Sequence, residues 1–148
     1  MLDIRFSSAL QAMLYLAVGA DGDERPTSSA ELATALGTNP SLVRRMLVPL
    51  AAGGLITSVK GRGGGTRLSR PAGEISLAEI YRCAVGEKPL WACRPEGEHV
   101  CLVSTNGAEY FARLTADAER AVLESLGGRT LADALADIRR LDREPAPR

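Results

Sequence analysis

The chain has 148 residues, 45% of them hydrophobic and 4% aromatic, so we expect a small folded protein with a core of aliphatic side chains. Because 18 Lys and Arg balance 18 Asp and Glu, the composition excludes a uniformly basic protein. Such a neutral chain can bind a polyanion only if its basic residues are gathered on one part of the surface. The three cysteines are an odd number without zinc-finger spacing, which does not suit the disulfide framework of a secreted protein.

The first predicted elements are two helices. Apolar residues at spacings of three and four predict a helix over residues 4–18, and the apolar segment 9–20 is too short to span a membrane. Ser28 and Glu31 form the pattern of a capping box, which predicts a second helix over residues 29–36. We expect a cytoplasmic protein that has no membrane partner.

A short turn leads to a third helix. Gly37 ends the second helix, and a few residues later Asn39 is a natural N-cap and Pro40 a natural first helical residue. The pattern predicts a helix over residues 40–52.

A hairpin follows the third helix. The β-branched residues 55–60 and the alternating residues 66–69 predict two strands, and the glycine-rich residues 61–65 form the tip between them. A further helix is predicted over residues 76–85, after which the periodicity is lost in a loop over residues 86–105.

A long helix is predicted near the carboxyl end, starting at Asn106 and Glu109 and running to about residue 126. Thr130 and Asp133 form the box that starts a short last helix. A lone helix with an apolar stripe needs a partner, either a second copy of the chain or its own head. The residues that we expect in a dimer contact are Phe111, Leu114, Ala118 and Val122.

The distribution of charge points to a function. No acidic residue lies between Glu31 and Glu74, and six basic residues fall in that interval. Helix, helix, turn, helix and hairpin is the order of a winged helix-turn-helix, whose third helix enters a major groove and whose hairpin, the wing, reaches the backbone or a minor groove. The residues that we expect to contact DNA are Ser28, Thr38, Asn39, Pro40, Ser41, Arg44, Arg45, Lys60, Arg62, Gly63 and Gly64.

Other function classes fit less well. The glycine-rich tip lacks the Gly-Lys-Ser/Thr ending of a nucleotide-binding loop and is not followed directly by a helix. A small redox or iron–sulphur enzyme is disfavoured because no general acid or base cluster accompanies the cysteines. A winged helix that binds an acidic protein partner instead of DNA stays an alternative.

The chain resembles a known family in residues 28–50, 54–56, 61–65 and 74–85, and in the cysteine-bearing loop before a long helix. These segments look like the Rrf-type transcription regulators that include IscR and NsrR, and the resemblance covers nearly the whole chain. It implies a homodimer in which the long helix crosses its twofold mate, with two winged-helix heads on a palindromic operator in double-stranded DNA. We expect a repressor and not an enzyme.

The resemblance divides the chain into four parts. Residues 1–85 are the expected mainly α winged helix-turn-helix domain with its small β-hairpin, and residues 86–105 the cysteine-bearing sensor loop. Residues 106–141 are the expected dimerisation helix and the short terminal helix, and residues 142–148 a flexible tail.

The sensor loop leaves three hypotheses open. Iron–sulphur members of the family use three closely spaced cysteines, whereas here only Cys93 and Cys101 lie in the loop and Cys83 lies on the preceding helix. The first hypothesis is a thiol switch, in which Cys93 and Cys101 form a disulfide or react with a small redox-active or electrophilic molecule. The second is a [2Fe–2S] cluster on Cys93, Cys101 and noncysteine ligands, for which His99 is the candidate. The third is that the cysteines have no sensing role and that a small ligand or a partner acts elsewhere on the chain.

Overall fold

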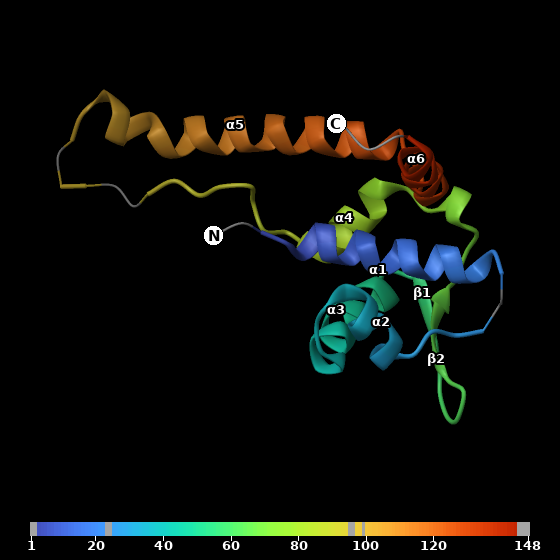
Figure 1. Ribbon diagram of the computed structural model, residues 1–148. Helices are drawn as coiled ribbons and strands as arrows, with labels where there is room; N and C mark the ends of the chain where they lie inside the picture. Colours follow the sequence, from blue (N-terminus) through green and yellow to red (C-terminus); the bar gives the residue numbers. More distant parts are fainter. Residues whose placement is uncertain (1–2, 23–24, 95–96, 99, 145–148) are drawn as a thin grey trace.

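The computed structural model describes residues 3–22, 25–94, 97–98 and 100–144 (Figure 1). It is mainly helical with one two-stranded antiparallel sheet, which confirms the predicted fold class. The elements in chain order are α1 (Arg5–Ala20), α2 (Ser29–Leu36), α3 (Pro40–Ala52), β1 (Ile56–Val59), β2 (Gly65–Leu68), the 3-10 turn η1 (Ala72–Glu74), α4 (Leu77–Val85), α5 (Leu102–Gly127) and α6 (Leu131–Arg143).

Helix α1 is the centre of the head, by which we mean α1 to α4, the hairpin and α6. It contacts α2, α3, α4, α6 and β2, and its inward face is fully covered. Leucine, isoleucine, valine and alanine dominate this core, as the scarcity of aromatic residues requires. The largest fully buried side chains are Met13, Leu32, Val43, Leu50, Leu55, Ile75, Ile80 and Leu131.

Local sequence signals determine the helix-turn-helix. The Ser28 hydroxyl accepts from the Glu31 N–H at 3.2 Å, and the Glu31 carboxylate accepts from the Ser28 N–H at 2.7 Å. Gly37 adopts a left-handed conformation with φ of 64°, which ends α2 without steric cost. The Asn39 side chain then accepts from the Leu42 N–H at 3.0 Å and caps α3. The chain therefore turns sharply from α2 into α3 over three residues.

The wing (β1 and β2 with the tip between them) is attached to the segment that precedes α2. Thr27 and Thr66 exchange backbone hydrogen bonds of 2.9 and 2.8 Å, so the segment before α2 pairs with β2 at a single antiparallel bridge. Thr66 is buried, and a Cβ on the neighbouring Gly65 would overlap the carbonyl group of Thr27. Only glycine permits this approach, which fixes the wing relative to the start of α2.

The start of the long helix differs from the sequence prediction. Helix α5 begins at Leu102, not at Asn106, and Cys101 is its N-cap. The Cys101 N–H donates to the Ser104 hydroxyl at 2.8 Å, which completes a capping box around the thiol. Asn106 lies inside the helix and its side-chain amide donates to the Leu102 carbonyl at 2.9 Å. The prediction was wrong because cysteine is not a usual capping residue, whereas Asn106 is a common one.

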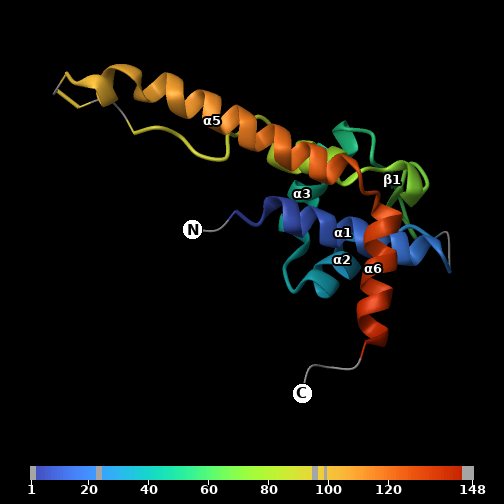
Figure 2. The same cartoon turned by 90° about the horizontal axis from the view of Figure 1, so that it is seen from above.

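Helix α5 has 26 residues and projects far beyond the head, whereas α6 returns across α1 (Figures 1 and 2). The loop after α4 runs back alongside α5, and the Leu90 N–H donates to the Glu119 carboxylate at 3.1 Å. At the other end of α5, residues Ser76 and Thr130 pair as a short antiparallel bridge that joins the starts of α4 and α6. Within the described residues, no helix is both long and apolar enough to cross a membrane.

Candidate nucleic-acid interface and sensor loop

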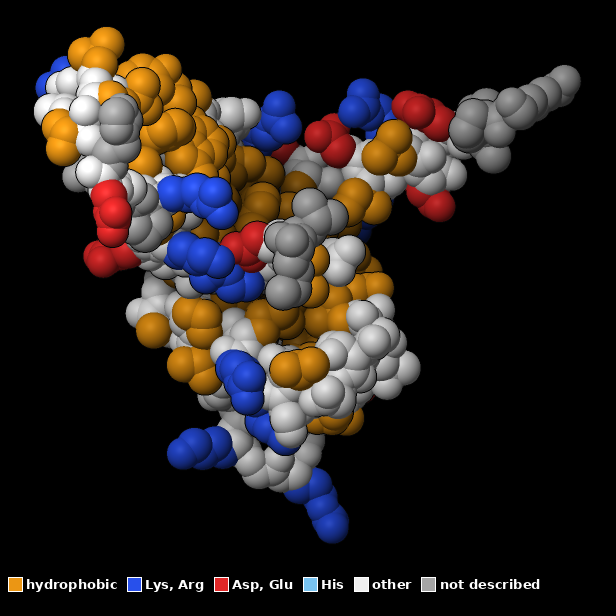
Figure 3. Space-filling view, turned by 90° about the vertical axis from the view of Figure 1, so that its left-hand side faces the viewer, with side chains coloured by type: hydrophobic (Ala, Val, Ile, Leu, Met, Phe, Trp, Pro, Cys, Tyr) orange, Lys and Arg blue, Asp and Glu red, His pale blue; other side chains and the backbone are white. Residues whose placement is uncertain are grey.

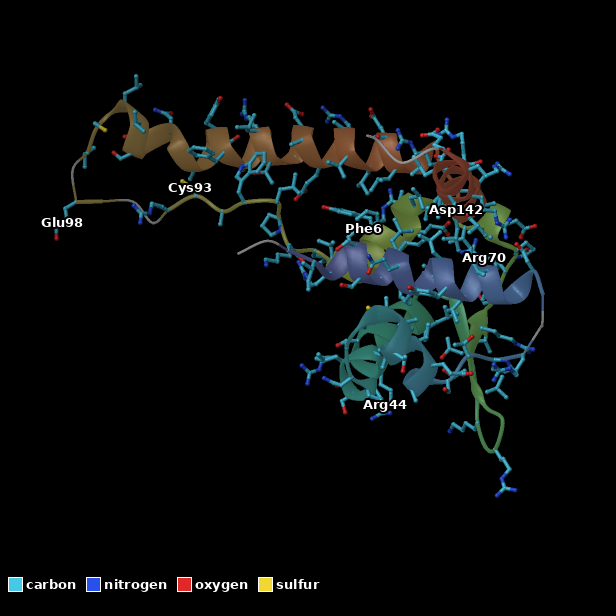
Figure 4. The ribbon with its side chains drawn as sticks, in the orientation of Figure 1. Phe6, Arg44, Arg70, Cys93, Glu98 and Asp142 are labelled. Atoms are coloured by element: carbon cyan, nitrogen blue, oxygen red, sulfur yellow. The ribbon has the colours of Figure 1, made fainter. Side chains whose placement is uncertain are left out.

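Helix α3 presents a polar, basic face to the solvent. Its buried side consists of Val43, Leu47 and Leu50, which lie against the core of the head. Arg44 and Arg45 lie off this stripe and are exposed. The Arg44 side chain points away from the head below α3 (Figure 4), with its guanidinium donating to the Ser41 hydroxyl at 3.3 Å.

The expected contact residues at the start of α3 lie in different situations. Thr38 and Ser41 are exposed, whereas Pro40 is partly covered as the first helical residue. The Asn39 side-chain oxygen and the Ser28 hydroxyl each accept a helix-capping hydrogen bond. Thr38 and Ser41 are therefore freer to contact phosphate than Asn39 and Ser28.

The tip of the wing carries two cations on a small backbone. Lys60, Arg62 and Gly63 are exposed, and Gly64 is partly covered by the turn. The wing extends from the same side of the head as α3, and blue basic side chains surround its end (Figures 1 and 3). These residues and those of α3 (Ser41, Arg44, Arg45, Lys60 and Arg62) form what we call the DNA face.

Ion pairing separates the cations of the acid-free segment. Arg70 donates to the Glu79 carboxylate and to the Glu74 carbonyl, both at 2.8 Å, and the Arg70 contact holds the pKa of Glu79 below its ordinary value. Among the described residues, no carboxylate pairs with any basic residue of the DNA face. Their charge is therefore available to a polyanion, whereas Arg70 stabilises the head.

The sensor loop places its two cysteines differently. Cys93 is an exposed loop residue below α5 (Figure 4), and Cys101 is the exposed cap of that helix. Hydrogen bonds from the Ser104 N–H, the Ser104 hydroxyl and the Val103 N–H lower the pKa of Cys101. Burial, with a smaller effect of Glu79, raises the pKa of Cys83. Cys101 is therefore the thiol that the fold favours as a thiolate.

The described residues of one chain do not fit a [2Fe–2S] cluster. No group of three or more His, Cys, Asp or Glu side chains in the described part of the chain could hold a metal ion. His99, the histidine candidate, lies outside the described residues. Cys93 and Cys101 alone supply two of the four ligands that such clusters need.

The apolar stripe of α5 is incompletely covered. Phe111 and Leu114 are 39% and 40% exposed, and Ala118 and Val122 are partly buried nearer the head. Further apolar side chains at the far end of α5 are more exposed, with Leu102 at 82%. Figure 3 shows hydrophobic side chains gathered at the upper left, over this projecting helix. Packing onto the chain's own head accounts for the second half of the stripe only.

Comparison with known proteins agrees with this arrangement. The model of the Rrf2 family, described as iron-dependent transcriptional regulators, matches residues 2–137. The chain is 34% identical over 126 residues to the protein aau3 of Rhizobium meliloti, covering 84% of this chain and 78% of that protein. It is 30% identical over 128 residues to the HTH-type transcriptional repressor NsrR of Streptomyces coelicolor, covering 86% and 83% of the two chains.

Solved structures show the same fold. A transcriptional regulator from Lactobacillus plantarum superimposes with a TM-score of 0.78 at 26% identity, covering 93% of this chain and 91% of that chain. The IscR protein of T. potens superimposes with a TM-score of 0.67 at 23% identity, covering 99% and 93%.

The cap geometry predicts the reactivity of Cys101. Because its pKa is lowered, we expect the pH midpoint of its alkylation by iodoacetamide to lie below that of Cys101 in the urea-unfolded chain. Ser104→Ala removes the hydroxyl donor and should move the midpoint upward. Peptide mass spectrometry over a pH series measures each cysteine separately, and Cys83 should react slowest because it is partly buried. Equal midpoints for folded and unfolded Cys101 would contradict the proposed effect of the cap.

Proposed function

The chain belongs to the Rrf2 family of DNA-binding transcriptional regulators, which are not enzymes, and we propose that it is a cytoplasmic homodimeric repressor that binds a palindromic operator through its DNA face. The observation that carries this proposal is that, among the described residues, no carboxylate forms an ion pair with a basic residue of the DNA face on α3 and the wing. The proposal also assigns a signal-sensing role to Cys93 and Cys101.

The two parts of the DNA face would contact different grooves. The first turns of α3 carry Ser41, Arg44 and Arg45. These side chains are polar, and the two arginines are long enough to reach base edges and phosphates in a major groove. The tip of the wing offers Lys60 and Arg62 with little side-chain bulk around them, which suits a minor groove or the backbone beside it. The Thr27–Thr66 bridge would hold the two parts at a fixed separation.

The first test uses an operator selected from a random duplex pool by the wild-type protein. We expect Arg44→Ala and Arg62→Ala to weaken binding and to lower the slope of log affinity against log salt by about 0.9 for each phosphate that the variant no longer neutralises. Fluorescence anisotropy over a salt series measures both quantities. Arg113→Ala removes the same charge from the solvated side of α5 and serves as the control. If both DNA-face variants bind like the wild type, the DNA face is wrongly assigned.

The exposed stripe of α5 supports a dimer. A 26-residue helix with apolar side chains exposed over its first half is stabilised when a second copy covers them. A twofold axis across α5 makes each stripe cover its mate and leaves one head on each side. Two heads arranged in this way suit half-sites one helical turn apart, about 34–36 Å.

A charge placed in the stripe should break the dimer. We expect Leu114→Glu to give a monomer because it places a carboxylate in the apolar contact, and operator affinity should fall because a monomer occupies only one half-site. Ala116→Glu adds the same charge on the opposite, exposed side of the helix and should stay dimeric. Analytical ultracentrifugation gives the outcome, and a dimeric Leu114→Glu protein would contradict this interface.

A thiol switch is the favoured sensing chemistry because Cys101 is both exposed and activated by its cap. Its thiolate can attack a hydroperoxide to give a sulfenic acid and an alcohol, and the Cys93 thiol can then form the disulfide with loss of water. Alkylation by an electrophile would modify the same sulphur. Either product would remove the thiol from the capping box and disturb the first turn of α5.

The alternative sensor is a [2Fe–2S] cluster, which the iron-dependent description of the family supports. If the thiol switch operates, we expect anaerobically purified protein to be colourless and iron-free. A hydroperoxide should weaken operator binding, and dithiothreitol should restore it. Operator binding by Cys101→Ser should not respond to the hydroperoxide. Cys83→Ser is the matched control because Cys83 lies on α4 with its sulphur beside Gly53 in the head. Visible absorption with bound iron and sulphide would instead support the cluster. Colourless protein whose binding ignores the oxidant would leave the cysteines without a sensing role.

A further inference from the structure

A second basic feature lies beside the DNA face. A groove of about 610 Å³ is formed by the end of α1, the segment before α2, the wing and the turn after β2. The charged side chains in its described lining are three arginines and one carboxylate, namely Arg25, Arg67, Arg70 and Asp21. Such a lining suits an anion better than a neutral molecule.

Ion pairs account for every charged residue of this groove except Arg67. Arg25 pairs with Glu31 at 2.9 Å and Arg70 with Glu79 at 2.8 Å. The carboxylate of Asp21 is neutralised by Arg139 of α6 at 2.5 Å. Within the described residues, Arg67 has no ion pair and no side-chain hydrogen bond, so its full charge faces the groove and the solvent.

A hydroxyl group lies beside this free cation. Arg67 on β2 is directly opposite Thr57 on β1, and both are exposed on the same face of the hairpin and line the groove. Among the described residues, the Thr57 side chain has no hydrogen-bond partner. A guanidinium and a hydroxyl side by side are a common donor set for phosphate oxygens.

The groove is continuous with the wing. Arg67 lies two residues from Gly65 along β2, roughly 7 Å from the start of the tip at the usual rise of a strand. The tip residues Lys60 and Arg62 lie farther along the hairpin, so Arg67 offers a separate position for a phosphate. A duplex that lies on α3 and the wing tip would continue past the base of the hairpin, where this groove opens.

We propose that Arg67, with Thr57, binds a backbone phosphate of the DNA that flanks the base pairs contacted by α3 and the wing tip. This inference rests on the proposed function and extends the DNA footprint at each half-site. The contact is independent of base sequence, so it adds affinity and salt dependence without adding base specificity.

The test compares two duplexes that carry the selected operator, one cut at the ends of the palindrome and one extended on both sides. On the extended duplex we expect Arg67→Ala to reduce the salt slope by about 0.9 for each half-site. Between 50 and 200 mM salt, the loss of affinity should then be about 3.5-fold smaller for each half-site than in the wild type. On the cut duplex the variant should bind like the wild type. Arg67→Lys keeps the charge and should keep most of the slope.

Controls separate this contact from a change in fold or in net charge. Arg120→Ala removes an equal charge from α5, where Arg120 pairs with Asp117, and should not alter the slope. Thermal melting followed by circular dichroism should be the same for wild type and Arg67→Ala, because the side chain is exposed.

Two results would overturn the inference. If Arg67→Ala leaves the salt slope unchanged, or lowers it equally on both duplexes, the flanking contact does not exist. Weaker binding by Arg44→Ala and Arg62→Ala would still support the DNA face in that case. Calorimetric titration with inorganic pyrophosphate tests the other source of phosphate. Binding that Arg67→Ala abolishes, with DNA affinity unchanged, would assign the groove to a small phosphorylated molecule instead of DNA.

Discussion

The backbone pairing of Thr27 with Thr66 is the constraint on which the DNA face depends. Thr27 directly precedes the capping box of α2, and Thr66 is the buried residue of β2. Because Gly65 has no Cβ, the two backbones approach closely enough to exchange hydrogen bonds. The wing and the start of α2 are therefore held together, and α3 follows α2 after a turn of three residues. A hairpin of four-residue strands would be marginal alone, and the bridge to Thr27 stabilises it.

Signals that act over three or four residues allowed much of the fold to be predicted. Ser28 with Glu31 defines the start of α2, and Asn39 with Pro40 defines the start of α3, through contacts within a few residues. The start of α5 could not be found in this way because Cys101 is an unusual cap. The sequence predicted the apolar stripe of α5. It could not predict that the stripe is exposed, because exposure depends on how far the helix extends beyond the head.

The sequence predicted where the basic residues gather but not which of them form ion pairs. The acid-free segment identified the basic surface, but it does not show which cations are paired, since Arg70 meets Glu79 from outside the segment. Arg67 was missed because nothing in the local pattern distinguishes it from Arg70. Its position opposite Thr57 follows from the strand register, which the turn and the Thr27 bridge determine together. Tertiary contacts therefore decide which arginines can meet a phosphate.

The two ends of α5 connect the sensor loop to the head. Its first turn depends on the Cys101 cap. Its last turn leads into the bridge between the starts of α4 and α6, where the Leu77 N–H donates to the Arg129 carbonyl at 2.9 Å and the Leu131 N–H donates to the Ile75 carbonyl at 2.8 Å. Leu131 is fully buried, so this junction is part of the core. In the proposed dimer, a change at the cap that repositions α5 against the second copy would therefore rotate each head as a whole. Such a rotation would alter the spacing of the two α3 helices while each α3 keeps its shape, and it would supply the two-state change that allosteric control of operator binding requires.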